Sequence, residues 1–220
     1  MKVAAIIPAY NEEEHIARVI QDTKKYVDKV IVVDDGSTDK TYQEAEKVKP
    51  DILLKHPINS GKGLALKTGI EAALIKNMDI IITLDSDGQH NPADIPRFLE
   101  YFKKNKLDLL IGARKLNKNM PIVFKIGNYI IQKTFKILFG VDVKDTQSGF
   151  RILKTKIYKK IIWNSTGYSV EAEMLANAGK HKLKIGELPI KTVYHDKAKG
   201  TTVIDGVVIV LNMLRWRLTR

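Results

Sequence analysis

Short apolar runs alternate with segments of helical spacing through the first half of the chain. The runs, rich in β-branched residues, are 3–7, 30–33, 52–54, 80–82 and 107–111. Buried strands of a parallel sheet are continuous apolar runs, and parallel strands need long crossover connections that are usually helical. The alternation therefore predicts an α/β fold, with a doubly wound and mostly parallel sheet.

The helices between these runs have recognisable beginnings. Asn11 and Asn91 are residue types that cap helices, and Pro92 suits a first helical position. Residues 62–75 are expected to form a further helix. We find no linker and no internal repeat, so residues 1–220 are expected to form a single domain.

Two later segments, about 120–140 and 203–220, combine many large apolar residues with regularly placed basic ones. Neither contains about 18 consecutive apolar residues, so neither is expected to span a bilayer. Basic amphipathic helices of this kind are typical of the membrane interface. The alternative is that both pack on the sheet or on a partner subunit.

The balance of charge favours an anionic partner. Lysine and arginine outnumber aspartate and glutamate to give a net charge of +12. Nucleic acid, acidic lipid headgroups and a phosphorylated substrate are all compatible with it. The chain has no cysteine, which excludes disulfides and thiolate metal sites. A cytoplasmic location is expected, peripheral on the cytoplasmic face of the membrane, because the N-terminus also lacks the pattern of a signal peptide.

The apolar run 80–82 ends in two carboxylates. Asp85 and Asp87 lie two residues apart, so in an extended chain their side chains point to the same face. Together with the Gln89 carbonyl they form a hard oxygen set suited to Mg²⁺ or Mn²⁺. A plain polar turn is the alternative. A calcium loop is excluded because its sixth and twelfth positions hold His90 and Pro96.

Two common nucleotide-binding motifs are missing. The turn at residues 8–14 has no glycine, which argues against a dinucleotide site, and residues 61–63 do not match a P-loop. What remains at the strand ends is a set of polar and charged side chains that can hold a mononucleoside diphosphate through one metal. They are Glu12, Asp35, Lys62, Asp85 and Asp87.

Five motifs then stand in order along the chain. They are VAAIIPAYNEE (3–13), VVDDGSTDKT (32–41), NSGKG (59–63), LDSDGQH (84–90) and DTQSGFR (145–151). In this order they resemble the family 2 glycosyltransferases of GT-A fold, in particular the inverting polyprenyl-phosphate type. The resemblance extends from residue 3 to about residue 189.

The resemblance implies roles on the donor side. Pro8, Tyr10 and Glu12 match positions that line the nucleoside pocket, and Asp35 matches the residue that reads the base. Lys62 matches a lysine near the base or the diphosphate. The metal set corresponds to Asp85, Asp87 and Gln89, with Asp87 counted among the catalytic residues.

Arg114, also counted among the catalytic residues, stands where a basic residue approaches the phosphates of the donor. The resemblance implies roles on the acceptor side as well, where Ser148 and Arg151 match a segment beside the acceptor. Glu173 matches a glutamate of the following helix. Lys125 and Arg151 are our candidates for aligning the acceptor phosphate. Where relatives carry an arginine near residue 197, this chain offers Lys197 or Lys199.

The expected reaction is transfer of a sugar from GDP-mannose or a UDP-hexose to a polyprenyl (dolichyl) phosphate. A peripheral membrane contact, a membrane-anchoring partner or a homo-oligomer would bring the enzyme to its acceptor. A hydroxyl acceptor is the alternative, and it would need Asp145 or Glu173 as a base. No nucleic-acid partner is expected, because the acidic strand ends would repel phosphate. A nucleotidyltransferase is disfavoured because the first turn lacks its glycine-rich basic sequence.

Overall fold

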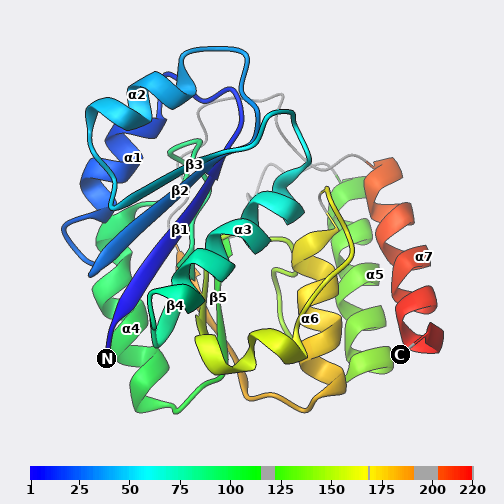
Figure 1. The fold of residues 1–220 in the computed structure, drawn as a ribbon. Helices are drawn as coiled ribbons and strands as arrows, with labels where there is room; N and C mark the ends of the chain where they lie inside the picture. The colour runs from blue at the N-terminus through cyan, green and yellow to red at the C-terminus, as the bar shows by residue number, and fades with distance from the viewer. Residues whose placement is uncertain (115–121, 168, 191–202, 220) are drawn as a thin grey trace.

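The computed structural model describes residues 1–114, 122–167, 169–190 and 203–219, with the side chains of 122–126, 203–207 and 219 left aside. Its centre is a seven-stranded sheet in the order β3-β2-β1-β4-β6-β5-β7 (Figure 1). Only β6 runs antiparallel to its neighbours among the described strands, so the predicted mostly parallel α/β sheet is confirmed. The strands are β1 (Val3–Ala9), β2 (Lys29–Asp34), β3 (Ile52–Lys55), β4 (Ile80–Thr83), β5 (Leu109–Arg114), β6 (Arg151–Lys154) and β7 (Ile185–Ile190).

Helices cover both faces of the sheet. Along β1, Ala4 and Ile6 face one apolar cluster while Ala5 and Ile7 face the other, because side chains alternate along a strand. The first cluster includes residues of α3 (Lys62–Ile75), α5 (Ile122–Phe139), α6 (Val170–Lys180) and α7 (Val203–Thr219). The second includes residues of α1 (Ile16–Thr23), α2 (Thr41–Lys47) and α4 (Ile95–Lys104). Two short 3₁₀ helices, η1 (Pro92–Asp94) and η2 (Thr155–Lys160), complete the described elements.

One of the two predicted asparagine caps is confirmed. The Asn91 side chain accepts a hydrogen bond from the Ala93 N–H at 3.0 Å, at the start of η1. Asn11 is not a cap, because α1 begins only at Ile16 and Asn11 has a φ of 52°. Its side-chain oxygen instead accepts from the Thr38 N–H at 2.9 Å. Asn11 therefore ties the turn after β1 to the turn after β2.

The reversed strand β6 shapes the functional edge of the sheet. Because β6 is antiparallel to β4, its first residue, Arg151, pairs with Thr83, the last residue of β4. The Thr83 hydroxyl also donates to the Gly149 carbonyl at 2.6 Å. The loop that precedes β6 is thereby held against the turn that follows β4, at the carboxyl ends of the parallel strands. This is the edge at which open α/β sheets bind ligands.

Candidate active site

Asp85 lies at the centre of a charged cluster at this edge. The Lys62 ammonium is 2.6 Å from Asp85 Oδ1 and 2.7 Å from Glu171 Oε1. On the other side, His90 Nδ1 lies 3.8 Å from Asp85 Oδ2. Lys62 opens α3 and Glu171 belongs to the first turn of α6. Two helix N-termini and the turn after β4 therefore converge on one carboxylate.

The environment of Asp85 keeps it ionised. Burial alone would raise the pKa of this carboxyl, but the charges of Lys62 and His90 outweigh burial and lower the pKa to about 2. Burial would lower the pKa of Lys62, but the Asp85 and Glu171 carboxylates outweigh burial and raise it. Burial lowers the pKa of His90, although the Asp85 and Asp87 carboxylates oppose that shift.

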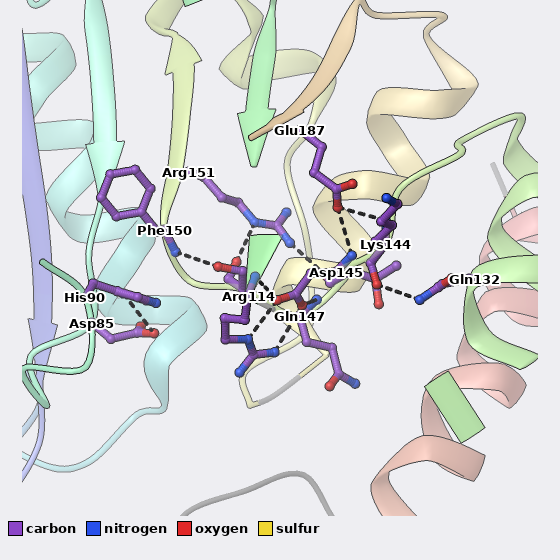
Figure 2. Close-up of polar contacts among 12 residues, drawn as sticks. Asp85, His90, Arg114, Gln132, Lys144, Asp145, Gln147, Phe150, Arg151 and Glu187 are labelled. Carbon is purple, nitrogen blue, oxygen red and sulfur yellow. Dashed lines mark hydrogen bonds and ion pairs between the residues drawn. The ribbon is translucent and has the colours of Figure 1, made fainter. Parts of the chain in front are cut away.

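The loop before β6 closes the site on its other side, and Figure 2 shows its polar contacts. Arg114 donates to the Asp145 carboxylate from Nε at 2.7 Å and from Nη2 at 3.0 Å. The backbone N–H of Arg114 donates to the same carboxylate at 3.0 Å. Glu187 accepts from the N–H groups of Lys144 and Asp145, at 2.8 and 2.9 Å. Strands β5 and β7 therefore both hold this loop.

Gly149 is the point at which the loop meets Asp85. A Cβ atom at this position would lie 2.3 Å from Asp85 Oδ2 and 2.4 Å from Oδ1, far inside contact distance. Only glycine lets the loop approach the carboxylate this closely. The Asp85 side chain is therefore enclosed by Gly149 as well as by Lys62 and His90.

Asp35, the residue expected to read the base, is fixed by a neighbouring loop. Its carboxylate accepts from the N–H groups of Ser60 and Gly61, at 3.1 and 2.7 Å. His56 Nδ1 lies 2.7 Å from the same carboxylate, and His56 Nε2 lies 3.0 Å from the Thr68 hydroxyl. These contacts hold the loop 56–61, which leads into Lys62, against the end of β2. Asp35 is 3% exposed, and its contact with the base stays a prediction.

Three residues expected at the acceptor side are buried instead. Arg151 is 1% exposed and donates to the carbonyls of Ser148, Thr146 and Glu171. Ser148 is fully buried beneath the loop. In this conformation Arg151 cannot contact an acceptor, because its guanidinium is enclosed by carbonyls. The predicted acceptor contact is corrected to a positioning role, in which Arg151 joins the loop to α6.

Glu173 likewise holds the chain in place. Its Oε2 accepts from the N–H groups of Asn164 and Ser165, at 3.0 and 2.9 Å, and from the Ser165 hydroxyl at 2.7 Å. The loop fixed in this way packs on Gly63, whose N–H donates to the Thr166 carbonyl at 2.9 Å. Glu173 is 1% exposed, so it has no access to a substrate hydroxyl here.

The remaining predicted residues lie in and after β1 or outside the described residues. Pro8 is buried within β1, while Tyr10, directly after that strand, is 43% exposed. The Glu12 N–H donates to the Thr41 hydroxyl at 2.7 Å. The side chain of Lys125 and the whole of Lys197 and Lys199 lie outside the described residues.

The turn after β4 carries the oxygen set that the sequence predicts for a divalent cation. Asp85 is ionised, and the Gln89 N–H donates to Asp87 Oδ1 at 3.0 Å, which fixes the turn. Within the described ranges, no three His, Cys, Asp or Glu side chains are grouped closely enough to hold a metal alone. A cation here would need further oxygens, as expected where a diphosphate completes the coordination.

Sequence reasoning missed Glu171 and His90. Glu171 and Glu173 stand two apart at the start of α6, and residues two apart on a helix face different directions. The structure turns Glu171 toward Lys62 and Glu173 toward the loop at 164–165. The spacing of the glutamates was visible in the sequence, but which of them faces the site depends on how α6 packs.

Comparison with known proteins identifies the family. The model of glycosyl transferase family 2 matches residues 4–162. The chain belongs to glycosyl transferase family 2. This family 2 protein is 34% identical to the UDP-N-acetylglucosamine–dolichyl-phosphate N-acetylglucosaminyltransferase of Methanococcus voltae, over 97% of this chain and 95% of that one. It is 28% identical to the undecaprenyl-phosphate mannosyltransferase of Micrococcus luteus, over 99% of this chain and 95% of that one.

Solved structures confirm the GT-A fold of this family 2 glycosyltransferase. Glucosyl-3-phosphoglycerate synthase from Mycobacterium tuberculosis, in complex with Mn²⁺, uridine diphosphate and phosphoglyceric acid, superposes with a TM-score of 0.78. The match covers 100% of this chain and 79% of that one at 18% identity. The predicted fold, family and enzyme class are thus confirmed.

Proposed function

We propose that this glycosyltransferase moves a sugar from a nucleoside-diphosphate sugar to a polyprenyl phosphate, with inversion at the anomeric carbon. The donor would be GDP-mannose or a UDP-hexose. The observation that carries the proposal is the ionised Asp85, enclosed by Lys62, His90 and Gly149 at the carboxyl edge of the sheet. Relatives named for dolichyl and undecaprenyl phosphate, matched over nearly the whole chain, support the choice of acceptor.

The donor half of the mechanism rests on charge. A Mg²⁺ or Mn²⁺ ion held by Asp85 and Asp87, with Gln89 beside them, would neutralise charge on the leaving diphosphate. Lys62 lies 2.6 Å from Asp85, so its ammonium is within reach of a diphosphate placed there. The Arg114 guanidinium is half-exposed and supplies a second positive charge at the same edge. Fixed cations that face developing negative charge are among the strongest contributions to catalysis.

The acceptor half needs no general base if the nucleophile is a phosphate. A phosphate monoester has a second pKa of about 6 and is largely dianionic at neutral pH. A hydroxyl acceptor would need a carboxylate base, and the two carboxylates considered for that task are engaged. Asp145 is bound by Arg114, and Glu173 holds the loop at 164–165. This favours the phosphate acceptor.

Helices α5 and α7 are where we propose contact with the membrane. They pack side by side at one edge of the molecule (Figure 1). Each buries one face and exposes apolar residues on the other. The exposed apolar residues are Tyr129, Ile130 and Ile137 on α5, and Val208, Leu211, Leu214 and Leu218 on α7.

The partner that fits this exposed face is an acidic bilayer surface. Lys133 and Lys136 border it on α5, and Arg215 and Arg217 border it on α7, all four exposed. Apolar residues flanked by basic ones suit the headgroup region of a membrane. Within the described ranges, no helix has the length and apolar character needed to cross a bilayer. We therefore propose a peripheral contact on the cytoplasmic face by a single catalytic domain; a second copy or a membrane-anchoring partner would be the competing occupants.

The test is transfer of labelled sugar by the purified protein. GDP-mannose, UDP-glucose and UDP-N-acetylglucosamine are each offered with dolichyl phosphate in detergent, with and without Mg²⁺ or Mn²⁺. Dolichol of the same chain length, which ends in a hydroxyl, is the matched control acceptor. We expect a lipid-linked product with one donor, only with the phosphate and only with the metal. Equal transfer to dolichol, or no transfer with any donor, would overturn the proposal.

A further inference from the structure

A basic pocket lies at the far end of α6 from the active site. It has a volume of about 560 Å³, and its charged lining consists of Lys159, Lys160, Lys180, His181 and Arg217. Glu171 stands in the first turn of α6 and Lys180 at its last residue. At 1.5 Å of rise per residue, the pocket is roughly 15 Å from the Asp85 cluster. It is therefore separate from the site proposed for transfer.

Three elements build this pocket and are tied together beneath it. Asn177, on α6 and 4% exposed, donates from its amide to the Ile162 carbonyl at 2.6 Å, just after η2. The Lys180 ammonium donates to the Trp216 carbonyl of α7 and lies 5.9 Å from the centre of the Phe139 ring of α5. The basic side chains therefore extend from three elements that are held together by these contacts.

All the titratable groups that line this pocket are basic. Lysines near helix C-termini are ordinarily explained by the helix dipole, which favours a cation there. That explanation accounts for each cation at its own helix end. It does not account for the convergence of three such ends, those of η2, α6 and α7, around one concavity. Such a set is suited to an anion with several oxygens, of which phosphate is the commonest.

We infer that this pocket binds the phosphate group of an anionic membrane lipid. Arg217 lines the pocket, while Leu214 and Leu218, on the same end of α7, are exposed. A lipid whose headgroup entered the pocket would thus have its acyl chains beside the apolar face of α7. The inference rests on the proposed membrane contact of α5 and α7 and adds a headgroup site to it. A second contact at the end opposite the active site would fix how the domain lies on the bilayer.

The test compares two pairs of lysines. Lys159→Gln with Lys160→Gln changes the pocket, and Lys103→Gln with Lys104→Gln is the matched control. Both pairs are adjacent, exposed and in the last turn of a short helix. Binding is measured by co-sedimentation with phosphatidylcholine vesicles that contain phosphatidylglycerol and no polyprenyl phosphate. We expect the pocket pair to weaken binding by roughly tenfold to thirtyfold, and the control by about twofold or less.

A second variant and a competition identify the source of the phosphate. Arg217→Gln alone should weaken vesicle binding about fivefold. Soluble glycerol phosphate at equal phosphate concentration should not displace the protein, because it lacks the apolar contact. Equal losses in the pocket and control pairs would overturn the inference. So would pocket-dependent binding of glycerol phosphate with unchanged vesicle binding, since the pocket would then serve a soluble anion.

The inference and the proposed function fail in different ways. Transfer to a detergent-solubilised acceptor should be the same in the pocket pair and the unsubstituted protein, because none of these lysines lies near Asp85. A protein that transfers sugar normally but shows no pocket-dependent vesicle binding refutes only the headgroup site. One that binds vesicles through the pocket but transfers nothing refutes only the proposed reaction.

Discussion

Two carboxylates stand at the same edge of the sheet, and each meets its cation differently. In the turn after β4, Asp85 contacts the single ammonium of Lys62, which is shared with Glu171. In the loop before β6, Asp145 accepts two hydrogen bonds from the Arg114 guanidinium and one from its backbone N–H. The Asp85 side chain is 25% exposed and that of Asp145 is 10% exposed.

The difference indicates a chemical role for Asp85 and a structural role for Asp145. A lysine ammonium is a point charge on a flexible stem, so it can leave one carboxylate for another anion at low cost. The paired hydrogen bonds of Arg114 to Asp145 are fixed in direction and would all be lost together. Asp85 is thus able to exchange partners when a donor binds, whereas Asp145 holds its loop in one shape. Substitutions that remove or displace one of these carboxylates test whether their roles differ in this way.

The largest effect is expected from Asp85→Asn compared with Asp145→Asn. Both remove a charge beside a cation, and both should lower the free energy of unfolding by about 2 kcal/mol. Transfer should fall by about a thousandfold or more in Asp85→Asn, because this substitution removes a carboxylate that would hold the metal ion facing the diphosphate. In Asp145→Asn it should fall only about tenfold, through a looser loop. Sugar-transfer rates and urea unfolding of the two proteins measure this, and equal losses of transfer would refute the contrast.

A methyl group on the loop should produce the next largest effect. Gly149→Ala would place a Cβ atom 2.3 Å from Asp85 Oδ2, so either the carboxylate or the loop must move. A displacement of about 1 Å in a catalytic group can cost about a hundredfold in rate, and we expect a loss of that size. Gly167→Ala is the control, because a Cβ atom there would meet nothing within 4 Å. Full transfer by Gly149→Ala would show that the loop does not fix Asp85.

The same contrast explains what could be predicted from sequence. Helix α3 begins at Lys62, directly after Gly61, and ends at Ile75, as predicted. The carboxylates at the strand ends follow from the strand pattern alone. The helix and the placement of the carboxylates both depend on residues that are close in sequence, and the structure contains both.

The features that could not be predicted depend on packing between distant segments. Strand β6 is four residues long, and nothing local shows that Arg151–Lys154 inserts antiparallel between β4 and β5. Arginine is a residue type that commonly binds phosphate at a protein surface, yet the carbonyls of the preceding loop and of α6 enclose Arg151. Which of Glu171 and Glu173 reaches the site was equally hidden, since it depends on the rotation of α6.

The smallest effect is the dependence of the free energy of unfolding on pH, which tests how Asp85 is held ionised. The pKa of Asp85 is lowered to about 2, and the pKa of Asp145 is also lowered, from an ordinary value of 3.8. A lowered pKa in the folded state adds stability above the unfolded value, which is lost as pH falls through the folded value. For Asp85 the contribution is about 2 kcal/mol, present above pH 4 and lost between about pH 4 and pH 2. Urea unfolding of the unsubstituted protein and of Asp85→Asn should therefore differ most near neutral pH and converge toward pH 2. A difference that stays constant across this range would show that Asp85 is not held ionised by Lys62.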